Sequence, residues 1–254
     1  KQKIADAEKQ AAAEAAELTK VSDTAGEAFE KWLAGRPAEA KLPGQVGHFP
    51  FDEYKDGKLP NFVAESKQAS SSQKNKIVPG KNGNALRLTG DDGVNLGIGN
   101  FKRTQPFSVA LWMNTPHHKE RTVVFSRSRA WTDAGSRGYQ MLLRDGHLSA
   151  SLIHFWPGNA ISVRTKAKLP KNEWHHVAIT YDGSTKAGGL EIYVDGKLAE
   201  IEIHKDNLYK NITGGGGDTI VTRSLSDALR ASLIAALGTA VTAVGAPAAA
   251  TRRR

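Results

Sequence analysis

Two short stretches of this sequence carry side chains of the kind that sugar-binding sites use. Exposed aromatic rings stack on the apolar faces of sugar rings, and amide side chains hydrogen-bond to the hydroxyl groups. The stretches cover residues 131–139 and 154–159, and their Gly, Pro and polar neighbours indicate loops. Burial of these side chains, or packing against a neighbouring domain, is the alternative. The candidate ligand-binding residues are Trp131, Tyr139, His154, Trp156 and Asn159.

Three acidic residues in expected loops could bind calcium, which requires several converging oxygen atoms. They are Asp91, Asp92 and Asp133, and solvated loop acids without a metal are the alternative. We expect no cofactor in this chain, with calcium as the alternative. The absence of cysteine excludes disulfides, thiolate metal sites, a cysteine nucleophile and haem attachment through C-x-x-C-H within it.

The carboxylates do not indicate glycoside hydrolysis. Retaining glycosidases need two carboxyl groups about 5 Å apart, and an E-x-D-x-E run on a strand would place alternate acids on one face. No such run occurs. Glu191 and Asp195 are close in sequence, but a turn accounts for Asp195. We therefore predict that the protein is not an enzyme, with glycoside hydrolase as a distant alternative.

Two pairs of adjacent histidines do not predict a metal site. His175 and His176 fall in an expected strand, so their side chains should point to opposite faces and cannot share a metal ion. His117 and His118 fall in an expected loop, and no third ligand is evident near them.

The middle of the chain has the pattern of an all-β domain. Short runs rich in β-branched and aromatic residues are separated by Gly, Asn, Asp and Pro at intervals of about ten residues, as in a sandwich. Asp195-Gly196 between the last two runs predicts a two-residue type I′ hairpin turn, because both positions need positive φ. The expected strands are residues 107–112, 122–126, 139–143, 148–153, 174–181, 190–194 and 197–203.

The two ends of the chain differ from this domain. Residues 1–36 are rich in Ala, Glu and Lys, with apolar residues at helical spacing, and predict a helical linker or stalk; a coiled coil is the alternative. Residues 219–254 contain no aromatic residue, no Glu and no Lys. They predict a low-complexity tail or Ala-rich helix, or out-of-frame translation. The remaining domain, residues 48–217, is the sandwich.

The charge pattern does not predict a nucleic-acid partner. The net charge is +9, but the basic residues are dispersed and three of them are Arg252–Arg254. Residues 228–250 are too weakly apolar for a membrane span. The absence of Met at Lys1 indicates an internal cut through a longer protein.

The sequence runs "WHHVAITYDG" (residues 174–183), "LEIYVDGK" (190–197) and "FSVALW" (107–112) identify a resemblance. Together they resemble the strand motifs of laminin-G-like domains in the concanavalin A-like lectin/glucanase superfamily. The resemblance covers roughly residues 48–217 and implies an antiparallel jelly-roll β-sandwich. That family closes its sandwich with a "gFxGxIDExRxY" segment, which does not follow residues 219–221 here. The sandwich is therefore expected to lack its last strands.

A narrower resemblance rests on "FWPGNAI" (residues 155–161), "YDGS" (181–184) and the "WLAG" that ends the helical segment (32–35). These runs are similar to large planctomycete cytochrome c-type multidomain proteins. The resemblance implies an exported parent protein, periplasmic or on the cell surface, in which neighbouring domains carry haem.

We therefore expect an all-β, concanavalin A-like sandwich with an N-terminal α-helix and an irregular or Ala-rich C-terminal tail. Its expected role is non-catalytic binding of a carbohydrate or another macromolecule within a multidomain protein. A structural spacer in a haem-containing redox protein is the alternative.

Overall fold

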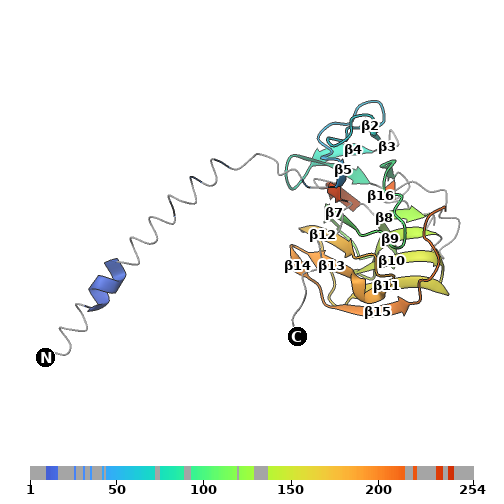
Figure 1. Ribbon diagram of the computed structural model, residues 1–254. Coiled ribbons are helices and arrows are strands. Elements are labelled where there is room, and N and C mark those ends of the chain that lie inside the picture. Colours follow the sequence, from blue (N-terminus) through green and yellow to red (C-terminus); the bar gives the residue numbers. More distant parts are fainter. Residues whose placement is uncertain are drawn as a thin grey trace. The chain divides into compact units, whose positions relative to one another are not determined.

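The computed structural model divides the chain into two compact units, Lys1–Lys41 and Leu42–Arg254. In the first unit, residues 10–16 form a helix (Figure 1), as the Ala-rich sequence predicts. Gln10 Nε2 donates a hydrogen bond to Glu14 Oε1 one helical turn away, at 3.3 Å. The structure describes residues 10–16, 26, 31, 35, 42, 44–71, 75–88, 93–118, 120–128, 137–214, 220–221, 233–236 and 240–242.

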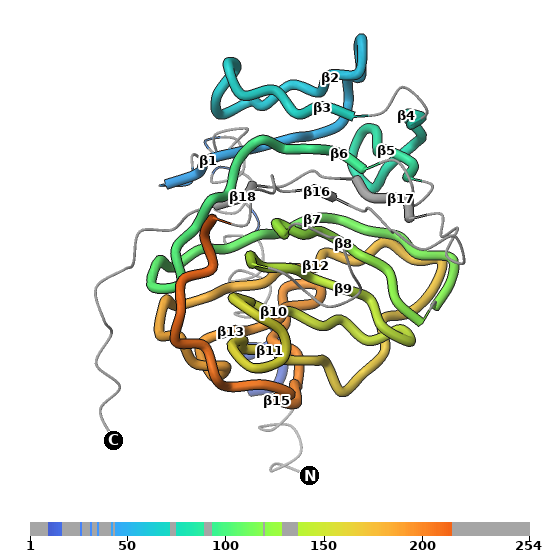
Figure 2. Tube along the Cα trace, turned by 90° about the vertical axis from the view of Figure 1, so that its right-hand side faces the viewer, coloured from blue at the N-terminus to red at the C-terminus, as the bar shows by residue number. Residues whose placement is uncertain are grey.

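The second unit contains two antiparallel sheets, which we call sheet A and sheet B (Figures 1 and 2). Neighbouring strands of sheet A follow the order β14 (Lys197–Leu198), β13 (Leu190–Val194), β12 (Trp174–Tyr181), β7 (Phe107–Asn114), β17 (Leu233–Ala236), β5 (Asn84–Leu88) and β4 (Lys76–Pro79). Beside this path, β18 (Ala240–Thr242) pairs with β7 and with β1 (Gln45–His48).

Sheet B follows the order β15 (Ile201–Asp206), β11 (Asn159–Thr165), β10 (His147–Phe155), β9 (Gly138–Arg144), β8 (Thr122–Ser128), β16 (Ile220–Val221), β6 (Val94–Asn95), β3 (Ala69–Ser71) and β2 (Lys58–Leu59). The one 3₁₀ turn among the described residues, η1 (Ala187–Gly189), leads directly into β13.

One hydrophobic core joins the inner faces of the two sheets. In β7 and β12 every second side chain is buried, which is the alternation of a half-exposed antiparallel sheet. Leu111 and Ile179 of sheet A belong to the same buried cluster as Met141 and Val163 of sheet B. The predicted all-β sandwich is therefore confirmed.

The Asp195-Gly196 turn has the conformation that its sequence predicts. Both residues have positive φ, +50° and +77°, and Val194 pairs with Lys197 across the turn. A two-residue turn of this hand matches the twist of the strands on either side. The turn therefore sets the register of β13 and β14.

The C-terminal segment differs from the sequence-based expectation. Three strands within residues 219–254 pair with the sandwich: β16 lies between β8 and β6, β17 lies between β7 and β5, and β18 pairs with β1 and β7. Composition marked this segment as a tail because its apolar runs are short and Ala-rich. Pairing partners from distant parts of the chain, which composition does not reveal, determine these strands. The predicted division of the chain into residues 1–36, 48–217 and 219–254 stays a prediction.

Candidate functional site

Four of the predicted site residues lie outside the described residues. Trp131 and Asp133 fall within residues 129–136, and Asp91 and Asp92 fall within residues 89–92. Their roles in ligand and calcium binding therefore stay predictions. In the part of the chain that the structure describes, no group of three or more His, Asp or Glu side chains is placed to hold a metal ion.

Tyr139 is a core residue and not a surface contact. Its side chain is 1% exposed, and its ring centroid lies 4.8 Å from that of Phe107. The hydroxyl donates a hydrogen bond to the carbonyl oxygen of Gly99 at 3.0 Å. The predicted ligand-binding role is corrected for this residue: β9 already begins at Gly138, so Tyr139 points into the sandwich instead of belonging to a loop.

The turn between β10 and β11 brings together the other three candidates, His154, Trp156 and Asn159. This turn is fastened to the segment that follows β15. Ala160 and Asn207 exchange two backbone hydrogen bonds of 3.1 and 2.9 Å. The side-chain amide of Asn207 donates a further hydrogen bond to the Gly158 carbonyl at 2.9 Å. Residues 154–159 and 207–211 therefore form one continuous local surface.

Asn159 is a buried residue that holds the two segments of this surface together. Its side chain is 3% exposed, and its Oδ1 accepts hydrogen bonds from the backbone N–H groups of Tyr209 (3.1 Å) and Lys210 (3.2 Å). A buried oxygen that already accepts two hydrogen bonds is not available to a ligand. Asn159 is thus a positioning residue, which corrects the contact role that the sequence predicted.

His154 fastens the other end of the same segment. Its Nδ1 lies 2.6 Å from the Asn211 carbonyl oxygen, and a carbonyl can only accept, so Nδ1 carries the proton. The Asn211 side chain in turn accepts a hydrogen bond from the backbone N–H of Arg103 at 3.1 Å. The half-buried imidazole therefore links the turn to the loop that precedes β7.

Two large side chains on this segment project into solvent. Phe155 is 68% exposed and Tyr209 is 59% exposed. The neighbouring Trp156 is half-buried. We call Phe155, Trp156 and Tyr209 the aromatic surface. Exposed rings held on a rigid backbone offer flat apolar faces at low entropic cost, and such faces bind apolar portions of a ligand.

Two members of the aromatic surface, Phe155 and Tyr209, were not predicted from the sequence. Phe155 falls within the 154–159 stretch that the sequence assigned to a loop, but it was not chosen as a candidate; in the structure it is the last residue of β10. Tyr209 stands among polar residues and follows the buried Leu208. A large aromatic residue in an otherwise polar segment was the available signal. Its spatial link to the β10–β11 turn depends on the hydrogen bonds of Asn159, which no sequence pattern indicates.

His175 and His176 lie on opposite faces of β12, as their adjacency predicts. His175 is buried, and its Nδ1 donates to Asp195 Oδ2 at 2.8 Å. His176 is half-buried, with its ring centroid 5.3 Å from that of Trp112. Burial lowers the pKa of His176, and the nearby Asp195 carboxylate opposes part of that effect.

The two acids considered for catalysis both have structural partners. Besides the bond from His175, Asp195 accepts the backbone N–H of His176 at 2.9 Å. Glu191 Oε2 accepts hydrogen bonds from Tyr193 (2.7 Å) and Thr180 (3.3 Å). The hydrogen bond to Glu191 is the main cause of a raised Tyr193 pKa. These contacts account for both carboxylates as parts of sheet A and its hairpin.

Comparison with solved structures shows the same fold in toxin binding domains. The binding domain of Paraclostridial Mosquitocidal Protein 1 matches with a TM-score of 0.61 and 14% identity, covering 79% of this chain and 49% of that one. The binding domain of botulinum neurotoxin DC, solved with rat synaptotagmin II, matches with a TM-score of 0.53 and 14% identity, covering 76% and 46%.

A third match is a botulinum neurotoxin type C structure, whose cell entry is described as dependent upon interaction with two ganglioside molecules. Its TM-score is 0.51 at 12% identity, covering 76% of this chain and 46% of that one. The chain thus spans about half the length of these structures, and at such identities the likeness shows the fold alone.

No curated protein matches the chain. In the described residues, no helix has the length and apolar character needed to cross a membrane. A laminin-G family model with the description "concanavalin A-like lectin/glucanases superfamily" matches residues 88–227, which is more than half of the sequence. With its two-sheet antiparallel fold and this match, the chain belongs to the concanavalin A-like lectin/glucanases superfamily.

Proposed function

We propose that this chain is a non-catalytic binding module that recognises carbohydrate through the aromatic surface. The observation that carries the proposal is the strong exposure of Phe155 and Tyr209 on a segment held by buried hydrogen bonds. Exposure of large apolar side chains to water is unfavourable, so a sugar face that covers these rings would lower the free energy of the complex. The toxin structures of the same fold, one of which is described with gangliosides, support the proposal.

The neighbouring polar groups suit a ligand with many hydroxyls. Asn207 and Lys210 are exposed on the same segment as Tyr209, within reach of a ligand on the aromatic surface. Stacking of rings would supply the affinity, and these polar side chains would select among sugars. Trp156 would contribute the edge of its half-buried ring.

The experiment is retention on a panel of polysaccharides in native affinity gels, followed by calorimetry with the best oligosaccharide. We expect Phe155→Ala and Tyr209→Ala each to weaken binding by about tenfold or more, because each removes a stacking face. Trp156→Ala should reduce binding as well.

Phe62→Ala is the matched control. Phe62 is 56% exposed like the aromatic surface, but it lies next to His48 at a ring distance of 5.8 Å. Its removal should leave retention unchanged. Failure of the unmodified chain to bind any polysaccharide would overturn the proposal. Equal losses of polysaccharide binding in Phe62→Ala and Phe155→Ala would do the same.

The same exposed rings also favour a second function, a structural spacer that docks against neighbouring domains. Phe155 and Tyr209 would then be buried in an exported, haem-bearing multidomain protein of the type that the sequence resembles. Absence of sugar binding, together with protection of these residues from chemical labelling in the longer protein, would support this function. Calcium at Asp91, Asp92 and Asp133 belongs to the binding proposal and is tested by adding a chelator to the gels.

A further inference from the structure

A cavity of about 360 Å³ opens at a different part of the sandwich, where sheet A and sheet B approach each other. Strands β10 and β11 contribute one side, and β13, β14 and the connection to β15 contribute the other. The cavity volume lies within the range of small-molecule sites. Seven of the residues that line it have apolar side chains: Leu148, Ala167, Leu169, Pro170, Val194, Leu198 and Ala199.

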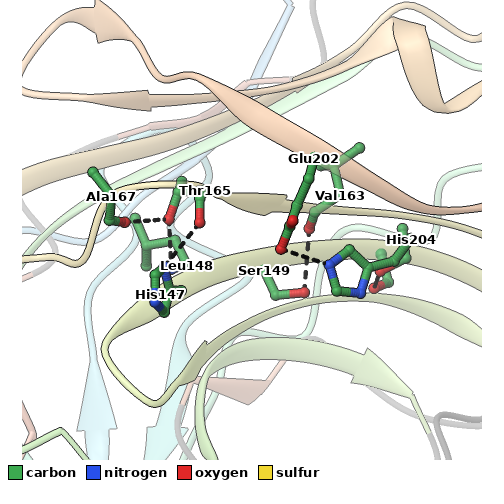
Figure 3. A network of polar contacts seen from close by, with 10 residues as sticks. His147, Leu148, Ser149, Val163, Thr165, Ala167, Glu202 and His204 are labelled. Carbon is green, nitrogen blue, oxygen red and sulfur yellow. Dashed lines mark hydrogen bonds and ion pairs between the residues drawn. The ribbon is translucent and has the colours of Figure 1, made fainter.

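Hydrogen bonds hold the walls of this cavity in place. The Thr165 hydroxyl accepts the backbone N–H of Leu148 at 3.1 Å and donates to the Ala167 carbonyl at 2.8 Å (Figure 3). His147 Nδ1 donates to the Thr165 carbonyl at 2.9 Å. The Leu169 N–H donates to the Gly146 carbonyl at 2.8 Å, so the loop after β11 is tied down at both ends. The cavity is therefore largely preformed.

Leu198 shows that the apolar lining is incompletely covered. It lies in the two-residue strand β14 at the end of sheet A, and its side chain is 58% exposed at the cavity. Leu148 and Leu169, which also line the cavity, are buried. An apolar group that entered the cavity would cover Leu198 and contact the buried leucines, and both effects favour binding.

The rim of the cavity is basic. Lys166, Lys168 and Lys197 lie around it, together with a single acid, Glu200. Lys166 Nζ lies 3.4 Å from Glu200 Oε2 and is thereby neutralised in part. Lys168 and Lys197 are exposed, and no carboxylate among the described residues pairs with either of them. Two positive charges therefore remain at the mouth of an apolar cavity.

From this arrangement we infer a second binding site for a small amphiphile with one anionic headgroup, such as a fatty acid. The apolar chain would occupy the cavity between the two sheets, and the carboxylate would lie between Lys168 and Lys197. A neutral apolar molecule would leave the two ammonium groups without a partner, and a purely polar anion would leave the leucine lining in water.

This site is independent of the aromatic surface. Leu148 is the second residue of β10 and Phe155 the last, and the seven steps of strand from one to the other span roughly 23 Å. Loss of one binding activity therefore leaves the other to be measured. A variant of the cavity should retain polysaccharide binding, and Phe155→Ala should retain binding of the amphiphile.

The probe is decanoate, used below its micelle-forming concentration. Its binding to the full chain is measured by calorimetry. We expect saturable binding at one site, with an affinity that rises about fourfold for each methylene group from hexanoate to decanoate. Decanol should bind about tenfold more weakly than decanoate, because it lacks the charge that the lysines attract. Added salt should weaken decanoate binding and leave decanol binding unchanged.

Two variants test the two parts of the site. Lys168→Glu combined with Lys197→Glu should weaken decanoate binding about tenfold and leave decanol binding unchanged. Ala199→Phe, which fills the cavity, should abolish binding of both. Lys67→Glu is the matched control, since Lys67 is exposed in the loop between β2 and β3, at the other end of sheet B. Circular dichroism verifies that each variant is folded.

Three outcomes would overturn the inference. They are equal affinity for decanol and decanoate, an unchanged affinity in the folded double lysine variant, and unchanged binding in folded Ala199→Phe. A fourth is sedimentation with anionic phospholipid vesicles that depends on the two lysines while free decanoate does not bind. That result would assign the basic rim to a membrane surface instead of a free ligand.

Discussion

Asp195 connects three features of the β13–β14 hairpin through one side chain. Its backbone supplies the first positive φ of the turn, one carboxylate oxygen accepts from buried His175, and the other accepts the His176 N–H. Asp tolerates the left-handed conformation better than most residues. Burial alone would raise the pKa of Asp195, but the hydrogen bonds from His175 and His176 outweigh it and lower the pKa below its usual 3.8.

The pH dependence of this contribution follows from the lowered pKa. A carboxyl group that binds its proton more weakly in the folded state stabilises the fold at pH values above the unfolded pKa. That stabilisation is lost as the pH falls through the lower, folded pKa. We therefore expect Asp195→Asn, which preserves the turn, to reduce the free energy of unfolding by about 1 kcal/mol at pH 7.

Urea unfolding of both proteins at pH 7 and at several values below pH 4 measures this prediction. The difference between their free energies of unfolding should shrink as the pH falls, because the unmodified chain loses by protonation the carboxylate charge that the variant already lacks. A difference that stays constant over this range would show that the charge of Asp195 contributes nothing to the hairpin.

At the scale of elements, the β10–β11 turn depends on one buried amide. Asn159 Oδ1 is the acceptor for two successive N–H groups of the segment that carries Tyr209. Asn159→Ala would leave both donors without this acceptor, and we expect it to reduce the free energy of unfolding by about 1–3 kcal/mol. It should also weaken polysaccharide binding, since Tyr209 loses its support.

Asn207→Ala provides the comparison for this prediction. Asn207 also makes a side-chain hydrogen bond across the turn, to the Gly158 carbonyl, but it is exposed. Water can replace that bond, so the loss of stability should be smaller. Equal losses for Asn159→Ala and Asn207→Ala in urea unfolding would contradict the assignment of Asn159 as the buried support.

The strands with clear periodicity were predictable, and contacts between distant segments were not. β7 and β12 alternate buried and half-exposed residues along their full length, and Asp195-Gly196 determines its own turn. The aromatic surface instead joins residues about fifty positions apart through Asn159. Tyr139 was misjudged for a related reason: the sequence placed it at the start of a strand, but its burial against Phe107 of the other sheet depends on a contact between distant segments.

For the whole molecule, the position of the C-terminal strands has the largest effect. β17 lies between β7 and β5, and β16 lies between β8 and β6, so each sheet contains a strand from the end of the chain. Composition alone assigned these residues to a tail, since runs such as Leu233–Ala236 carry no strand signature of their own. Their place in the sheets is a property of the complete chain.

Removal of residues 215–254 should therefore disrupt the sandwich. Without β17 and β16, β5 and β6 lose their links to β7 and β8, and edges of both sheets become unpaired. We expect a protein without a cooperative thermal transition or near-ultraviolet circular dichroism. Removal of residues 243–254 alone retains all described strands and is the control. Cooperative unfolding of the shorter protein at an unchanged temperature would contradict the role of these strands.

The strands that end the two sheets bear on how this protein behaves at high concentration. β2 and β14 have two residues each, and β4 contains Pro79, which cannot donate a backbone hydrogen bond to a further strand. The longest end strand, β15, carries Glu202, Lys205 and Asp206, and β1, which borders sheet A beside β18, has four residues. Short, proline-containing or charged borders of this kind oppose strand-by-strand joining of one copy to the next. A crowded solution of this module should consequently remain free of fibres.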